Sequence, residues 1–149
     1  MFRGHFEHAV DDKGRVAIPA RFRDALSGLQ DERLVVTKFK IRGRPCLDVY
    51  PFSAWRLLEG KILSKNRFDP AVRQLKSAYV SVAHECPLDS QGRILIPPLL
   101  RSYAGLRREV MFTGEIDMFR IWDKKVWQLT AGEDERIFDE PDLLKQLDI

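Results

Sequence analysis

Apolar and polar residues alternate in two short stretches of the chain, at residues 5–10 and 80–86. In each stretch one set of side chains falls on a single face of a two-residue period, which is typical of a half-buried strand. The two sets are Phe6, His8 and Val10, and then Val80, Val82, His84 and Cys86. The pattern predicts a β-strand in each stretch.

The residues after each predicted strand follow one common order. An Asp comes first, then a tight turn that ends in Gly, then an Arg, a short apolar strand and one or two prolines. Proline removes a donor from a strand but suits the first position of a helix, so we expect a helix to begin there. The predicted short strands are 16–18 and 94–96, and the predicted helices are 20–26 and 99–103, with Gly28 and Gly105 just past their ends.

Two more strands are predicted after each helix. They cover residues 34–39 and 46–50 in the first half, and 109–113 and 118–122 in the second half. Each half therefore has the order strand, turn, strand, helix, strand, strand.

A helical segment separates the two halves. Trp55, Leu58 and Ile62 recur at helical spacing, and Asp69-Pro70 has the form of an N-cap followed by a first-turn proline. From residue 131 onward the chain is acidic, and its leucines predict a short helix or a frayed end.

One thirteen-residue motif occurs twice. DDKGRVAIPARFR, from Asp11 to Arg23, returns as DSQGRILIPPLLR, from Asp89 to Arg101, with six of thirteen positions identical at an offset of 78 residues. The match extends to Trp55 and Trp127, where the offset is 72 residues. The first copy therefore has about six extra residues, which are most simply placed in a basic loop at 40–45.

The repeat predicts the fold class, which is α+β and mainly β. Each copy is too small to bury a core alone, so two copies in one chain are expected to pack together with pseudo-twofold symmetry. The predicted parts are a first repeat at 5–52, a helical connector at 53–79, a second repeat at 80–124 and a helical, acidic tail at 125–149.

The repeated turn has a specific chemistry. A three-residue hairpin loop needs a residue of positive φ, and Gly14 and Gly92 stand where it is needed. Asp11 can accept backbone N–H bonds from the turn and can pair with Arg15 across the strands. This arrangement by itself could serve only to set the hairpin. Two copies related by an axis suggest a DNA-binding role as well, because duplex DNA also presents symmetric contacts.

Arginine suits such an interface, because it can bond bidentately to guanine or bind a phosphate. Lys13 at the loop tip can neutralise a phosphate, and Arg21, Arg23 and Arg101 follow on the two short helices.

The amino-acid composition adds only a little to these predictions. Hydrophobic residues make up 44 % and charged residues 32 %, which is globular, and no run approaches the ~20 apolar residues of a membrane span. The formal net charge is +3, yet residues 131–149 hold seven acids and two bases, so the rest of the chain is strongly basic. A basic body favours a polyanion partner. Cys46 and Cys86 are isolated and are expected to be buried and unpaired in a cytosolic protein.

Other candidate chemistry is weak. His5 and His8 point to opposite faces of a strand, so no metal site is expected, and His84 stands alone. Asp11, Asp12 and Asp89 could be catalytic carboxylates only with partners that the sequence lacks, so an enzyme is not expected. The three tryptophans are expected to pack in cores rather than to stack on bases; they are Trp55, Trp122 and Trp127.

The stretches MFRG, DDKGRVAIPARFR, LDSQGRILIPPLLR, LDVYPFSAW and FRIWDKKVW together resemble the MraZ family of bacterial regulators. The resemblance implies an AbrB-like swapped-hairpin barrel made from two β-α-β-β halves with Asp-x-x-x-Arg turns. It also implies a ring-shaped homo-oligomer that binds DNA repeats upstream of its own gene, in a cluster for division and cell-wall synthesis, usually as a repressor. A cytoplasmic, nucleoid-associated protein with no cofactor, small-molecule substrate or membrane partner is the expectation.

Carried onto this chain, the resemblance makes Arg15 and Arg93 the principal DNA contacts. The full expected set of DNA-binding residues is Lys13, Arg15, Arg21, Arg23, Gln91, Arg93 and Arg101, and the residues that orient the motif are Asp11, Gly14, Asp89 and Gly92. Gln91 and Leu99 replace Lys13 and Arg21, so the first repeat is expected to supply more electrostatic affinity. The alternative function is an antitoxin-like or scaffold protein that binds a protein partner.

Overall fold

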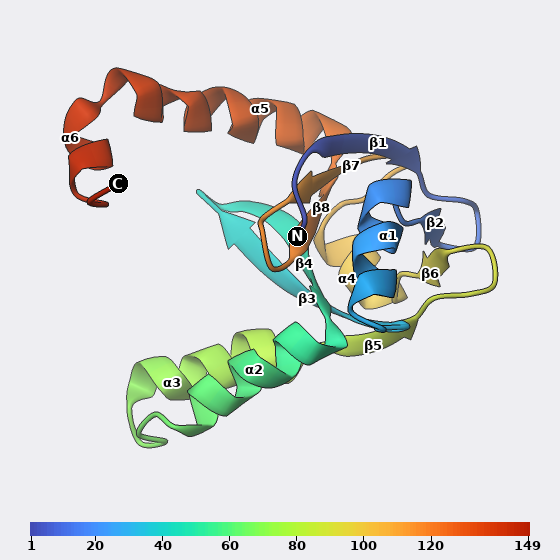
Figure 1. Cartoon of the computed structure of the whole chain (residues 1–149), viewed down its shortest axis with the longest axis horizontal. Helices are drawn as coiled ribbons and strands as arrows, with labels where there is room; N and C mark the ends of the chain where they lie inside the picture. Colours follow the sequence, from blue (N-terminus) through green and yellow to red (C-terminus); the bar gives the residue numbers. More distant parts are fainter.

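Strands from both halves of the chain share one six-stranded antiparallel sheet in the computed structural model, which describes residues 1–149. The sheet has the order β1-β7-β8-β4-β3-β5, and β2 and β6 form a separate two-stranded ribbon (Figure 1). The strands are β1 (His5–Ala9), β2 (Arg15–Ala17), β3 (Arg33–Ile41), β4 (Arg44–Pro51), β5 (His84–Pro87), β6 (Arg93–Leu95), β7 (Glu109–Gly114) and β8 (Phe119–Asp123).

The topology is that of two exchanged halves. The first strand of each half leaves its own half, because β1 pairs with β7 and β5 pairs with β3. The equivalent strands of the two halves are β1 and β5, β3 and β7, and β4 and β8. When each strand is exchanged for its equivalent, the same strand order results, read from the opposite edge of the sheet. The topology of the sheet therefore has twofold symmetry. The ribbon obeys the same symmetry, since Arg15 faces Leu95 and Ala17 faces Arg93. The predicted α+β, mainly β class with two repeats is confirmed.

The main core lies between the sheet, the ribbon and two short helices, α1 (Ala20–Gly28) and α4 (Pro98–Tyr103). Phe22 and Leu26 on α1 are 1 % exposed, and Leu100 on α4 is 3 % exposed. Burial of one such side chain contributes about 1.5–3 kcal/mol. The helices thus fix the ribbon that carries the repeated turns onto the sheet.

Two helical arms extend on the side away from the ribbon (Figure 1). The connector arm contains α2 (Phe52–Leu63), α3 (Pro70–Leu75) and the π-helix η1 (Lys76–Val80), and the C-terminal arm contains α5 (Lys124–Asp134), the 3₁₀ helix η2 (Glu135–Asp139) and α6 (Pro141–Lys145). No helix has the length and apolar character needed to cross a bilayer.

The two halves meet through an ion pair at the pseudo-twofold axis. Asp48 on β4 and Arg120 on β8 are equivalent positions of the repeats and face each other in the register. The Arg120 Nε donates to Asp48 Oδ1 at 2.7 Å, and the Tyr79 hydroxyl donates to Oδ2 at 2.6 Å. Asp48 is 2 % exposed, and burial raises the pKa of its carboxyl against the opposing effects of Arg120 and Tyr79. The sequence pattern did not point to this pair.

Three local predictions were wrong. The strand predicted from Val80 begins only at His84, because the helix continues through Val80, where Tyr79 is buried and its carbonyl accepts the Thr37 hydroxyl at 2.6 Å. Gly28 is the last residue of α1, and the left-handed residue after it is Gln30, with φ of 56°.

The basic loop predicted at 40–45 is the tip of a long hairpin instead. Strands β3 and β4 pair as far as Ile41 and Arg44, and the turn is only Arg42-Gly43, both with positive φ as a type I′ turn requires. Arg42 and Arg44 bind the acidic end of α5, with Arg42 Nη1 2.8 Å from Asp134 Oδ1. The helix α5 begins at Lys124, one residue before the tail predicted at 125–149.

The remaining core predictions are confirmed. Cys46 and Cys86 are buried and unpaired, and burial raises the pKa of their thiols to about 12 and about 11. Trp55 and Trp122 are 4 % and 3 % exposed and lie in two smaller apolar clusters, while Trp127 packs at the edge of the second cluster.

Candidate nucleic-acid interface

The first repeated turn is held by its aspartate. Asp11 Oδ1 accepts the backbone N–H groups of Lys13 and Arg15, both at 2.9 Å, while Arg15 Nε donates to Oδ2 at 3.0 Å. The backbone closes the loop, since the Gly14 N–H donates to the Asp11 carbonyl at 3.0 Å. Gly14 has φ of 87°, a conformation that only glycine adopts easily. The predicted ion pair and the predicted role of the glycine are confirmed.

The second turn reproduces this geometry. Asp89 Oδ1 accepts the N–H groups of Gln91 and Arg93 at 2.8 and 2.9 Å, and Arg93 Nε donates to Oδ2 at 2.9 Å. Gly92 has φ of 73°. Two segments that share only part of their sequence thus build the same hydrogen-bonded turn, because the aspartate, the glycine and the arginine are the residues that form it.

The aspartates orient the arginines and leave them accessible. The backbone N–H of Arg15, above all, holds the pKa of the Asp11 carboxyl below its ordinary value of 3.8, and the N–H of Arg93 does the same for Asp89. Both pairs are therefore charged at neutral pH. The Arg15 and Arg93 side chains stay 34 % and 29 % exposed, and only Nε of each is bonded within the chain. The terminal amino groups remain available to a phosphate or a base edge.

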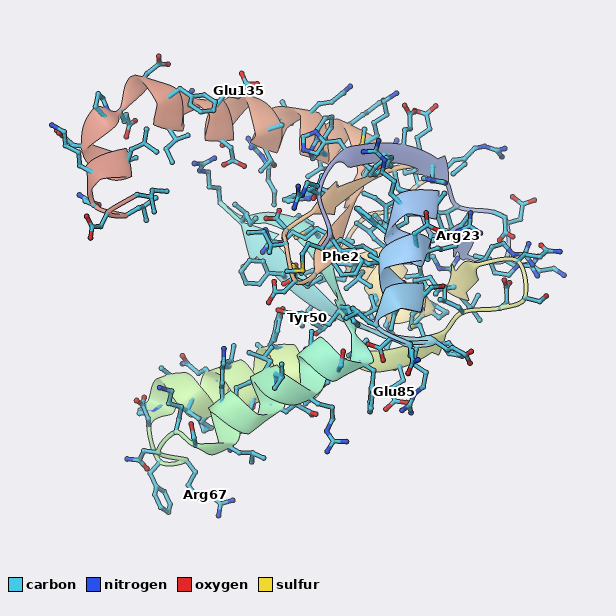
Figure 2. All side chains as sticks on the ribbon, viewed as in Figure 1. Phe2, Arg23, Tyr50, Arg67, Glu85 and Glu135 are labelled. Atoms are coloured by element: carbon cyan, nitrogen blue, oxygen red, sulfur yellow. The ribbon has the colours of Figure 1, made fainter.

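The ribbon brings both turns to one end of the molecule. Ile18 N–H donates to the Gly92 carbonyl at 3.0 Å, and Ile96 N–H donates to the Gly14 carbonyl at 2.9 Å. Each turn is therefore bonded to the strand that leads into the helix of the other repeat. Figure 2 shows Arg23 on the side of α1 that faces this ribbon.

The other predicted contact residues are unequally placed. Lys13 and Gln91 are exposed at the two loop tips, and Arg21 is exposed on α1 without an ion pair inside the chain. Arg23 and Arg101 lie against the turns themselves, each against the turn of the opposite repeat. The sequence placed these two arginines on the helices but did not indicate that crossing.

The surroundings of the two turns differ in charge. A hollow of about 820 Å³ beside the second turn is lined by four carboxylates and one arginine; these are Asp24, Asp31, Glu32, Asp89 and Arg23. In the first turn Asp12 partly offsets Lys13, where the second turn has Ser90 and Gln91. No group of three or more His, Cys, Asp or Glu side chains is arranged to hold a metal ion.

Comparison with known proteins agrees with the doubled motif. The family described as "MraZ protein, putative antitoxin-like" matches this chain twice, at residues 1–78 and 80–145. The chain belongs to the MraZ family. The two matches divide at residue 79, between the two copies of the turn.

Curated MraZ relatives align over most of this chain. The Transcriptional regulator MraZ of Shewanella denitrificans is 39 % identical over 98 % of this chain and 95 % of its own. Those of Actinobacillus pleuropneumoniae and Thioalkalivibrio sulfidiphilus are 41 % and 43 % identical, over 90 % and 89 % of this chain and 87 % of each of theirs. A solution structure from Pyrococcus horikoshii covers 81 % of this chain and 88 % of its own at 14 % identity and a TM-score of 0.37, which is too distant to support an argument.

Proposed function

We propose that this chain is a transcriptional regulator that binds specific duplex DNA through its two Asp-x-x-x-Arg turns. The observation that carries the proposal is the pair of identically bonded turns at one end of the molecule, each presenting an accessible arginine. The name of the relatives, Transcriptional regulator MraZ, supports it. An enzymatic role has no comparable support.

In this mechanism each turn acts as a preformed contact. Asp11 and Asp89 fix the Nε side of their arginines, so little side-chain entropy is lost when the terminal amino groups bind. Arg15 and Arg93 read guanine edges or clamp phosphates, while Lys13 contacts phosphate without reading sequence. Binding releases counterions and is therefore weakened by salt.

The resemblance to the family supports a proposal for the target and the assembly. The proposed target is a set of DNA repeats upstream of the chain's own gene, in a division and cell-wall cluster. The proposed outcome of binding is repression, and the proposed location is the nucleoid. A ring-shaped homo-oligomer is proposed because linked copies multiply weak contacts. The arms suit such contacts, since residues 52–80 hold six bases and two acids, while residues 131–149 hold seven acids and two bases. Sedimentation as a monomer at micromolar concentration would rule out the ring.

The test is fluorescence anisotropy against the native upstream duplex, with a shuffled duplex of equal composition, at low and near-physiological salt. We expect a preference for the native duplex that persists at the higher salt. Arg15→Ala and Arg93→Ala should each weaken binding by about 1–3 kcal/mol. Arg67→Ala is the matched control, because it removes the same charge from an exposed site at the far end of the connector arm (Figure 2). Equal loss in all three variants would mean that net charge alone binds the DNA.

One observation favours a second candidate, a protein-binding role of the antitoxin type. Both arms expose large apolar side chains, among them Phe68 at 85 % and Phe138 at 76 %. A single stoichiometric protein partner captured by the full chain, with no preference between the two duplexes, would support this alternative against DNA regulation.

A further inference from the structure

We infer that each DNA-contacting unit is built from both repeats: Arg101 of the second repeat completes the Asp11–Arg15 turn, and Arg23 of the first repeat completes the Asp89–Arg93 turn. The ligand of each composite unit is a phosphodiester group of the DNA backbone. The inference rests on the proposed function and adds to it the assignment of each helix arginine to the turn of the other repeat.

The space over each glycine shows the crossing directly. A Cβ atom at Gly14 would lie 2.4 Å from Arg101 Cζ and 2.7 Å from its Nη1. A Cβ atom at Gly92 would lie 2.6 Å from Arg23 Cδ and 2.8 Å from its Nη1. Each helix arginine therefore rests on the bare Cα of the opposite turn, and a Cβ atom there would require the end of that arginine side chain to move.

The backbone enforces this arrangement. The Gly14 carbonyl accepts the N–H of Ile96, which directly precedes the prolines that open α4. The Arg101 N–H then donates to the Pro97 carbonyl at 3.0 Å, so Arg101 lies in the first turn of that helix. The symmetric bonds, from Ile18 to Gly92 and from Arg23 to Pro19, do the same for the other unit.

The charges indicate what the units bind. Neither Arg23 nor Arg101 forms an ion pair within the chain, and Arg101 Nε is buried without a hydrogen-bond partner. The single aspartate that holds each turn is already bonded to the arginine of its own motif. Each unit thus brings two guanidinium groups to one carboxylate that is already bonded, and the hollow beside the second unit adds Asp24, Asp31 and Glu32. The first unit is therefore the more favourable of the two for an anion. In the proposed unit an incoming phosphate accepts hydrogen bonds from the terminal amino groups of both arginines.

The crossing predicts which pairs of residues are energetically coupled in DNA binding. Arg15→Ala, Arg93→Ala and Arg101→Ala are measured singly and in pairs by anisotropy on the upstream duplex. Arg101→Ala alone should weaken binding on the order of tenfold. Combined with Arg15→Ala it should add little further loss, because both arginines serve one unit. Combined with Arg93→Ala the two fold-changes should multiply, because the units are separate.

A readout without DNA keeps the inference separate from the proposed function. In amide NMR spectra of the free protein, Arg101→Ala and Arg101→Lys should both shift the Gly14 resonance and leave Gly92 in place. Lysine keeps the charge but not the planar group, so Arg101→Lys distinguishes packing from charge. Arg107→Ala, at an exposed site of the same repeat, is the control.

The outcomes are distinguishable. Coupling of Arg101 to Arg93 instead of Arg15, or a Gly92 shift instead of a Gly14 shift, would overturn the crossed assignment. Absence of DNA binding by the unmodified chain, together with the expected Gly14 shift, would refute the proposed function and the phosphate ligand but leave the crossed packing intact. DNA binding with multiplicative losses in both pairs would refute the composite units and leave the regulator standing.

Discussion

The ion pair between Asp48 and Arg120 provides a stringent test of how the two halves are held together. It lies where β4 pairs with β8. This is the only strand pairing between the β3–β4 hairpin and the β7–β8 hairpin. Asp48 is 2 % exposed, and the Arg120 side chain is 19 % exposed. Replacement of Arg120 by Met leaves a buried carboxylate whose one remaining side-chain partner is the Tyr79 hydroxyl.

The magnitude follows from this burial. Breaking one side of a buried ion pair costs about 3–5 kcal/mol, because the remaining charge stays desolvated. We take about 3 kcal/mol, since Arg120 also reaches solvent and binds the exposed Glu115. For a domain of this size that corresponds to a fall in Tm of roughly 6–12 °C. The double variant Asp48→Leu with Arg120→Met should be more stable than Arg120→Met alone, because it buries no charge.

Thermal and urea unfolding measure the stability of Arg120→Met and of the double variant. The pH dependence of that stability tests whether a buried carboxylate causes the loss. Burial raises the pKa of folded Asp48, so the folded state binds more protons than the unfolded state between the two pKa values. Removal of Arg120 should raise it further. The deficit of Arg120→Met should therefore shrink as the pH falls from neutral towards the raised pKa of the Asp48 carboxyl. A variant within about 1 kcal/mol of the parent, or a deficit that does not change with pH, would refute the argument from a desolvated carboxylate.

Four further outcomes are expected. Gly14→Ala should lose about 1–2 kcal/mol of stability in urea unfolding, because φ there is 87°, and a smaller loss would show that the turn relaxes. The Asp11 carboxyl should titrate below 3.8 by NMR, and its pKa should rise only part of the way towards 3.8 in Arg15→Ala, because the backbone N–H of residue 15 remains. The stability that the lowered pKa contributes is present above the ordinary pKa and is lost as the pH falls through the lowered one. The buried thiols of Cys46 and Cys86, with pKa raised to about 12 and about 11, should react with a thiol reagent only on unfolding; fast labelling of native protein would contradict their burial. The salt dependence of DNA binding should fall by about one ion per arginine removed from a turn, whereas an unchanged slope would place that arginine off the backbone.

Local structure could be predicted from the sequence wherever a few adjacent residues determine it. The turns needed only an aspartate, a glycine and an arginine at fixed spacing, and both formed with the predicted bonds. The prolines at 19 and 97 stopped the strands and opened the helices as expected. Errors arose where a distant contact overrode a local pattern. Tyr79 extended a helix into a predicted strand, and the acidic end of α5 lies against a hairpin tip that resembled a loop.

The sequence by itself determined that the chain is two copies of one unit, because periodicity, prolines and turn chemistry are short-range signals that repeat at a fixed offset. Only the tertiary structure decided how the copies are joined. The pairing of β1 with β7 and the placement of Arg101 over Gly14 bring together residues 87 to 108 positions apart. Such partners are selected by the packing of a shared core and not by neighbouring residues. The turns can therefore be read from the sequence, but the crossing of their arginines appears only in the folded molecule.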